Sequence, residues 1–312
     1  MKKLSEPYGF SRTELEVFKE LIPSSASISD LSRRINKSPP TVMVAVETLQ
    51  EKGLVDFEKK GNRKIIKTSE SKHAHLLQEL FLEFPHISWQ EVLSYSGIIP
   101  LLDRDATDPE KASRTTQWRA LRNDMAHGLV TRHDNKITIS PRFQKLEEFI
   151  QEFRRFNNSR MATIASKAAA IIWSRGSQFI MRVPLGTTIS DPRFRPTATT
   201  LMPQYGVPLI SNVEYYYFSP SAETIGPEEV VLHSLLTDGI TNVTLGLILI
   251  AKAELDRNRL LIIAKEYDLK PQVEGMLRFL DTGKSDPESI LPTWQEFEDK
   301  AGEYGLRLER PS

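Results

Sequence analysis

The chain contains no cysteine among its 312 residues. This absence excludes disulfide bonds, a thiolate nucleophile and any zinc or iron–sulfur site with cysteine ligands. Proteins without cysteine pairs are typical of a reducing compartment, so the sequence predicts a cytoplasmic location.

Long apolar runs are also missing. The most apolar stretch, GLILIAKAEL at 246–255, is far shorter than the roughly 20 residues that a membrane helix needs. The N-terminal sequence MKKLSEPYGFSRTELEVF has two lysines with no apolar segment behind them, so we expect no signal peptide. We therefore expect no membrane partner.

The common catalytic motifs are absent. The chain has no GxxxxGK[ST], GxGxxG or HExxH pattern. His73 and His75 would point to different sides of a helix, and His233 has apolar neighbours typical of a core histidine. Arg175-Gly176-Ser177 resembles the Gly-Ser of nucleotidyltransferases, but only Asp191 follows nearby, whereas their Mg²⁺ chemistry needs a pair of carboxylates. We predict no enzyme, cofactor or bound metal, although a triad assembled in space stays open.

Charge is unevenly distributed along the chain. The whole sequence holds 41 basic and 41 acidic residues, of which 14 and 19 lie in 170–312. The remaining 27 and 22 lie in 1–169, so a balance of +5 precedes a balance of −5. This asymmetry favours a nucleic-acid-binding N-terminal part joined to a different kind of domain.

Residues 11–68 have the pattern of three helices and a β-hairpin. Ser11 and Glu14 form a capping-box pattern before the first helix, and Ser38 precedes a helix that ends at Gly53. The strands LVDFE and IIKT then flank the basic turn KKGNRK. This order predicts a winged helix-turn-helix.

The same stretch resembles the DNA-binding domain of the MarR and ArsR regulator families. The resemblance rests on Ser38, Thr41, Val42, Leu49, Lys52-Gly53-Leu54-Val55 and the wing Gly61-Asn62-Arg63-Lys64, about a fifth of the chain. It implies a transcriptional regulator that binds duplex DNA.

Cations and hydroxyl groups of this unit are the expected DNA contacts. The predicted set is Arg33, Arg34, Lys37, Ser38, Thr41, Val44, Lys59, Lys60, Arg63 and Lys64. Val44 belongs to this set because its methyl groups suit a thymine methyl group. Met43 and Glu47 lie on the same helix but are poor base contacts, so they are not part of the set. A helix with this face is weak in direct readout, and the alternative is that it contacts protein.

A looser copy of the pattern follows about 75 residues later. It comprises a helix at 88–102 interrupted near Gly97 and Pro100, a short helix at 108–113, a third helix, Gly128-Leu129-Val130 and an Ile-rich strand. Its polar residues are Arg114, Thr115, Gln117, Arg119, Arg122 and Lys136. Because Arg and Gln pair with guanine and adenine edges, we predict that this second unit contacts bases better than the first. The alternative is a solvated face on a structural winged helix.

The segment after the second copy predicts a long helix. One apolar stripe on 141–157 holds Phe143, Leu146, Ile150 and Phe153, which suggests a dimerisation surface. The small residues that follow predict helix up to Gly176. Beyond it, a short strand, a Tyr-rich strand and five helices predict an α/β domain that senses a ligand or binds a partner.

The C-terminal part carries a second resemblance. The helix EEVVLHSLL after a Tyr-rich strand ending in FSP, and the closing LPTWQEFEDKAGEYGL, resemble antitoxins of nucleotidyltransferase (type IV abortive-infection) toxin–antitoxin systems. The resemblance implies repression of the protein's own operon and a cognate toxin as partner.

The predicted fold class is mainly α with small β elements. Its expected parts are a first winged helix-turn-helix at 1–75, a second at 76–140, connector helices at 141–175 and a helix-rich α/β domain at 176–312. The predicted function is a DNA-binding transcriptional regulator acting as a homodimer. The alternatives are an antitoxin and autorepressor, and a winged-helix protein–protein scaffold without sequence-specific DNA binding.

Overall fold

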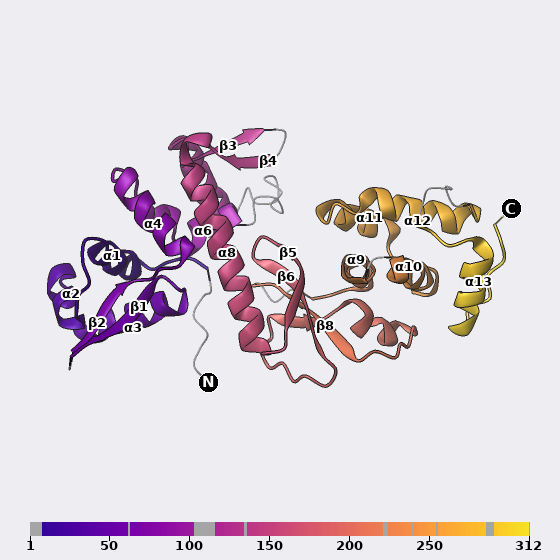
Figure 1. Cartoon of the computed structure of the whole chain (residues 1–312). Coiled ribbons are helices and arrows are strands. Elements are labelled where there is room, and N and C mark those ends of the chain that lie inside the picture. The colour runs from indigo at the N-terminus through magenta and orange to yellow at the C-terminus, as the bar shows by residue number, and fades with distance from the viewer. Residues whose placement is uncertain are drawn as a thin grey trace. The chain divides into compact units, whose positions relative to one another are not determined.

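The computed structural model describes residues 8–61, 63–102, 116–133, 136–220, 224–238, 240–253, 255–284 and 290–311 (Figure 1). Helices dominate these residues and the sheets are small, which confirms the predicted fold class. The chain forms two compact units, one of residues 1–161 with 175–177 and one of residues 162–174 with 178–312. The long helix therefore belongs mostly to the first unit, together with both winged-helix patterns.

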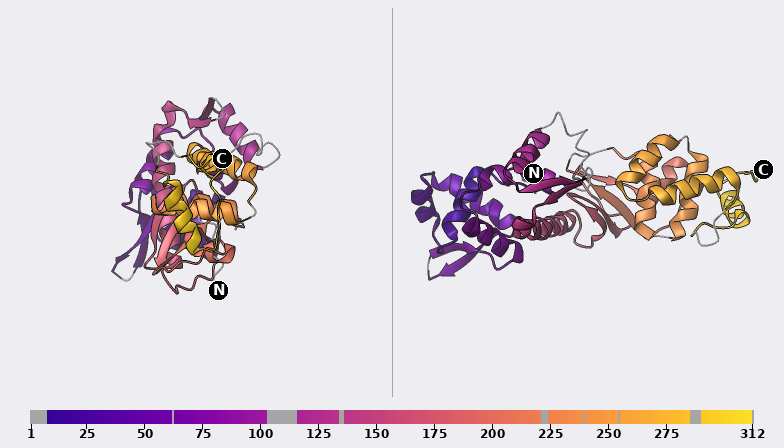
Figure 2. Two further views of the ribbon diagram at one scale, coloured as in Figure 1. Left: turned by 90° about the vertical axis from the view of Figure 1, so that its right-hand side faces the viewer. Right: turned by 90° about the horizontal axis from the view of Figure 1, so that it is seen from above.

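The first unit begins with the predicted winged helix-turn-helix. Its elements are α1 (Arg12–Leu21), α2 (Ile28–Ile35), α3 (Pro39–Glu51), β1 (Val55–Lys60) and β2 (Arg63–Thr68). The side chains of Ser11, Ser27 and Ser38 each accept a hydrogen bond from the third backbone N–H that follows. Helices α1 and α3 therefore start where Ser11 and Ser38 predict. The hairpin β1–β2 pairs in antiparallel register and projects from the helices as the wing (Figures 1 and 2).

The second copy of the pattern is present with a different helix break. Its elements are α4 (Lys72–Glu83), α5 (Trp89–Val92), α6 (Tyr95–Leu102), α7 (Thr116–Ala126), β3 (Val130–His133) and β4 (Lys136–Ile139). The predicted short helix at 108–113 lies outside the described residues. The break falls at Ser94, because Gly97 approaches the α5 carbonyls so closely that a Cβ would lie 2.3 Å from the Glu91 oxygen. Gly97 therefore permits the turn from α5 into α6.

Helix α8 (Gln144–Ala165) follows a 3₁₀ turn at Pro141–Phe143. The four side chains assigned to dimerisation, Phe143, Leu146, Ile150 and Phe153, are each at most 4% exposed within the single chain. Phe143 packs against Phe84 and Phe153 against Phe10, with ring centroids 4.8 and 5.2 Å apart. The stripe is therefore core of the first unit, which corrects its interpretation as a dimerisation surface.

The predicted helix up to Gly176 is wrong beyond Ala165, where a strand replaces it. That strand, β5 (Ala170–Arg175), belongs to a four-stranded sheet of order β5-β6-β8-β7. The other strands are β6 (Gln178–Pro184), β7 (Phe194–Pro196) and β8 (Val213–Phe218). The β-branched pair Ile171-Ile172 and Trp173 favour a strand, and alanines before them masked this preference.

The second unit completes its fold with helices. They are the 3₁₀ turns η3 (Ala198–Thr200) and η4 (Met202–Tyr205) and the helices α9 (Pro227–Asp238), α10 (Ile240–Lys252), α11 (Arg257–Glu266), α12 (Lys270–Thr282) and α13 (Trp294–Glu303). Val231, Leu247, Met276 and Phe297 are fully buried at the centre of this helical cluster. The five helices lie where the sequence predicts them. None of the helices in the described parts of the chain is both long enough and apolar enough to cross a membrane.

Candidate nucleic-acid interface

Helix α3 has one buried and one open face. Val42, Val46 and Leu49 are fully buried, whereas Thr41 is exposed and Val44 is 63% exposed. The buried positions repeat every three to four residues, so the intervening positions face outward. The described structure thus leaves the N-terminal half of α3 free to meet a partner.

The open face of α3 begins with the short side chains of Ser38, Thr41 and Val44, and Met43 and Glu47 lie half-buried beside them. The hydroxyl oxygens of Ser38 and Thr41 are 2.8 Å apart, and the Thr48 hydroxyl donates to the Val44 carbonyl at 3.0 Å. Pro39 and Pro40 occupy the first helical turn and are exposed. Val44, 63% exposed, is the most exposed large apolar side chain of this helix among the described residues.

The same unit exposes cationic side chains. Lys37 precedes α3 and is exposed, as are Lys59 and Lys64 of the wing. The Lys64 ammonium lies 3.5 Å from the centroid of the Phe57 ring, which holds the lysine along the hairpin. These three cations are available to a polyanion.

Two predicted arginines have intramolecular contacts. Arg33 forms an ion pair with Asp30 one helical turn earlier, and Arg34 donates to the Glu20 carbonyl at 3.4 Å. Both side chains are exposed, so these contacts are weak and exchangeable. The side chains of Lys60 and Arg63 lie outside the described residues, although their backbones pair at the tip of the wing.

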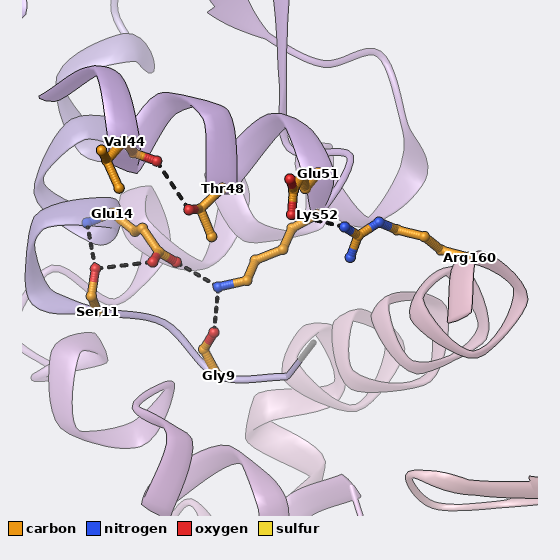
Figure 3. A network of polar contacts seen from close by, with 8 residues as sticks. All are labelled: Gly9, Ser11, Glu14, Val44, Thr48, Glu51, Lys52 and Arg160. Atoms are coloured by element: carbon orange, nitrogen blue, oxygen red, sulfur yellow. Dashed lines mark hydrogen bonds and ion pairs between the residues drawn. The ribbon is translucent and has the colours of Figure 1, made fainter. Parts of the chain in front are cut away.

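A buried ion pair fixes the C-terminal end of α3 (Figure 3). The Lys52 ammonium is 2.5 Å from a Glu14 carboxylate oxygen and donates to the Gly9 carbonyl at 2.6 Å. Burial lowers the pKa of Lys52, and the negative charge of Glu14 opposes this shift. Lys52 was recognised only as part of a motif. Its spacing of three from Leu49 could have placed it on the buried stripe.

Helix α8 packs against the same end of α3. Gly53 has φ +68°, and a Cβ there would lie 2.5 Å from the Phe156 ring. Arg160 donates to the Glu51 carboxylate at 2.8 Å (Figure 3). The buried His73 ring bonds the Lys52 carbonyl at 2.9 Å, and burial lowers its pKa. These contacts set the position of α3 within the first unit.

Helix α7 of the second copy has a different environment. Arg119 lines a cavity together with Glu91 and Asp124, and Asn123 donates to Glu91 at 3.4 Å. Arg122 is exposed. The carboxylates beside Arg119 would repel DNA phosphates, so this face is less suited to DNA than its residue types predicted.

The other predicted contacts of the second copy are incompletely placed. Arg114 and Thr115 lie outside the described residues. Gln117 and Lys136 have described backbones in α7 and β4 but no described side chains.

His233 is the buried core histidine that its neighbours predicted. Its Nδ1 lies 2.6 Å from the Thr197 hydroxyl and its Nε2 lies 2.9 Å from the Tyr267 hydroxyl. Burial lowers its pKa to about 3, so the imidazole is neutral at pH 7. Both ring nitrogens are therefore occupied within the second unit.

Comparisons with known proteins identify two regions. A family model described as a winged helix-turn-helix DNA-binding domain matches residues 24–56, and a C-terminal family named HVO_2833_C matches residues 191–306. No curated protein and no solved structure gives a significant match. The first match spans α2, α3 and the start of β1, and so includes the open face of α3. The N-terminal part of this chain is a winged helix-turn-helix similar to those of DNA-binding proteins.

Proposed function

We propose that the chain is a non-catalytic, DNA-binding transcriptional regulator whose first winged helix docks on the duplex. In this arrangement α3 enters the major groove and the wing contacts phosphates. The observation that carries the proposal is the open face of α3 in one unit with exposed cations, Lys37 directly before the helix and Lys59 and Lys64 in the wing. The match of residues 24–56 to a DNA-binding family agrees with it.

The chemistry of α3 favours docking over extensive base recognition. A major groove about 12 Å wide admits an α-helix, and short side chains let that helix approach the base edges closely. Val44 offers methyl groups to a thymine methyl, whereas Thr41 offers one hydroxyl. Few base contacts and several phosphate contacts predict modest sequence preference and strong salt dependence.

The test is salt-dependent binding of the full chain to mixed-sequence 30-base-pair duplexes, measured by fluorescence anisotropy. The double variant Lys59→Ala/Lys64→Ala should bind more weakly, and its log–log salt slope should be shallower by about 0.9 for each phosphate that the variant no longer neutralises. Lys265→Ala removes an exposed lysine of α11 and serves as the control. An unchanged slope in the double variant, or no binding at low salt, would remove the proposal.

The predictions about regulator family, dimerisation and a toxin partner need experiments of their own. MarR- or ArsR-like regulation, a homodimer and a cognate toxin all stay predictions, and the description of the C-terminal match names no activity. A nucleotidyltransferase gene beside this one would favour the antitoxin alternative. The scaffold alternative uses the Met43–Val44 face for protein, and it predicts no salt-dependent binding to arbitrary duplexes.

A further inference from the structure

A polar cavity lies in the second winged-helix copy, between α5, the start of α6 and α7. Its volume is about 360 Å³, within the range of small-molecule sites. Every described residue of its wall has a polar side chain: two carboxylates, one guanidinium, two hydroxyls and two amides. Such a wall suits a small hydrophilic ligand.

The carboxyl group of Asp124 is the most unusual part of this wall. Asp124 is only 2% exposed, and its Oδ2 has no hydrogen-bond partner among the residues that the structure describes. A buried polar atom without a partner destabilises the fold, so its persistence calls for an explanation. A ligand that donates hydrogen bonds to this carboxylate would supply the missing partner.

The charges around the cavity define that ligand. Glu91 lies on the same wall as Asp124, and Arg119 supplies one positive charge. Once Asp124 has lost its proton, two carboxylates face one guanidinium, which leaves room for one added cation. Nowhere among the described residues do three or more His, Asp or Glu side chains come together as metal ligands, which disfavours a metal ion here.

We propose that this cavity binds a small organic cation that presents an ammonium or guanidinium group to Asp124. The cavity is larger than such a head group, so a neutral or anionic tail extends toward Arg119. Ser94 stabilises the turn between α5 and α6 in this wall, because its hydroxyl donates to the Glu91 carbonyl at 2.7 Å and accepts from the Gly97 N–H at 3.2 Å. The residues of this site lie outside α3.

Saturation-transfer NMR on the full chain at pH 8 tests the head group. Methylguanidinium is the probe, and methylurea is its neutral counterpart of the same shape. We expect methylguanidinium to bind saturably and at least tenfold more tightly than methylurea. Equal binding of the two probes, or no binding of the cation, would overturn the proposal.

Variants then locate the site. Asp124→Asn keeps the size of the side chain and should weaken methylguanidinium binding at least tenfold, whereas Asp299→Asn, an exposed carboxylate of α13, should leave it unchanged. Arg119→Ala should strengthen binding, because it removes a like charge, and this variant decides the matter even if Asp124→Asn fails to fold. Cation binding that is insensitive to both wall variants would place the probe elsewhere and refute the assignment.

The pH profile adds a readout specific to the carboxyl group. Burial raises the pKa of Asp124 to about 7, and the nearby His127 opposes the shift. Binding should therefore strengthen between pH 6 and pH 8 as Asp124 loses its proton. Glu91 and Arg119 are the other charged groups on the wall, and His127 is the titratable neighbour of this carboxyl group. A flat profile would show that Asp124 is not the receptor.

Discussion

At the scale of single residues, the first unit contains a buried ion pair that the sequence did not predict. The buried pair Lys52–Glu14 joins the end of α3 to α1, with Lys52 only 2% exposed. Removing one partner leaves an unpaired buried charge, which typically costs about 3–5 kcal/mol. Lys52→Ala should lower the free energy of unfolding by an amount in this range, measured by urea titration.

An apolar replacement of the whole pair is the informative control. Lys52→Met/Glu14→Leu removes both charges and should recover most of the lost stability, because burial of ions is itself costly. If the double variant is less stable than Lys52→Ala, the pair has a structural role beyond charge compensation.

Asp124 makes stability depend on pH in a predictable direction. Its pKa rises from 3.8 to about 7 on folding, so the folded state retains a proton that the unfolded state has lost in this window. The free energy of unfolding should therefore fall as pH rises from about 4 to about 7, by up to about 1.4 kcal/mol per pH unit, and level off above.

The comparison with Asp124→Asn isolates this contribution. The variant cannot ionise at this position, so the difference between its urea midpoint and that of the wild type should change between pH 4 and pH 7. A constant difference would contradict the raised pKa.

Among elements, the two Gly-Leu-Val turns offer a matched test. Gly53 and Gly128 have φ of +68° and +71°, but only Gly53 has a close neighbour among the described residues, the Phe156 ring. Gly128→Ala should cost only the strain of positive φ, about 1 kcal/mol. Gly53→Ala should cost at least twice as much in the free energy of unfolding, because α8 must also move. Equal losses would show that α8 yields freely.

The predictability of elements follows from how local their determinants are. Capping serines and Gly-Leu-Val turns are local, so α1, α2, α3 and the wing were predicted from the sequence. The β5 strand depends on pairing in a sheet, and the small alanines before it favour helix by intrinsic propensity. The stripe on α8 was correctly predicted as apolar. The residues that pack on this stripe were not predicted correctly, because an apolar stripe can pack against the same chain or against another chain.

At the scale of the whole molecule, the apolar residues of α8 do not determine whether the protein forms a dimer, because they belong to the core of the single chain. Phe153 is fully buried and stacks on Phe10 and Phe149. Phe153→Ala should therefore lower the free energy of unfolding by about 3–5 kcal/mol and leave the sedimentation behaviour of the folded protein unchanged. A shift from dimer to monomer in folded protein would restore the dimerisation role.

The sequence predicted the exposed cations of the candidate interface but not which charged residues folding would bring near them. Residue types correctly marked Lys37, Lys59 and Lys64 as surface cations, because lysines in turns are solvated. They could not predict that Arg119 lines one cavity with Glu91 and Asp124, because folding alone brings these residues together, and its role as a DNA contact stays a prediction. The charges that surround a side chain depend on tertiary structure and cannot be predicted from residue type alone.

The division of α3 into two faces has a consequence for evolution. Val42, Val46 and Leu49 maintain the fold, while Val44 projects 63% of its surface into solvent. Substitutions at position 44 therefore alter what the helix meets without disturbing what holds the helix in place. A lineage of such proteins can acquire new targets by single mutations on this face, each nearly neutral for stability.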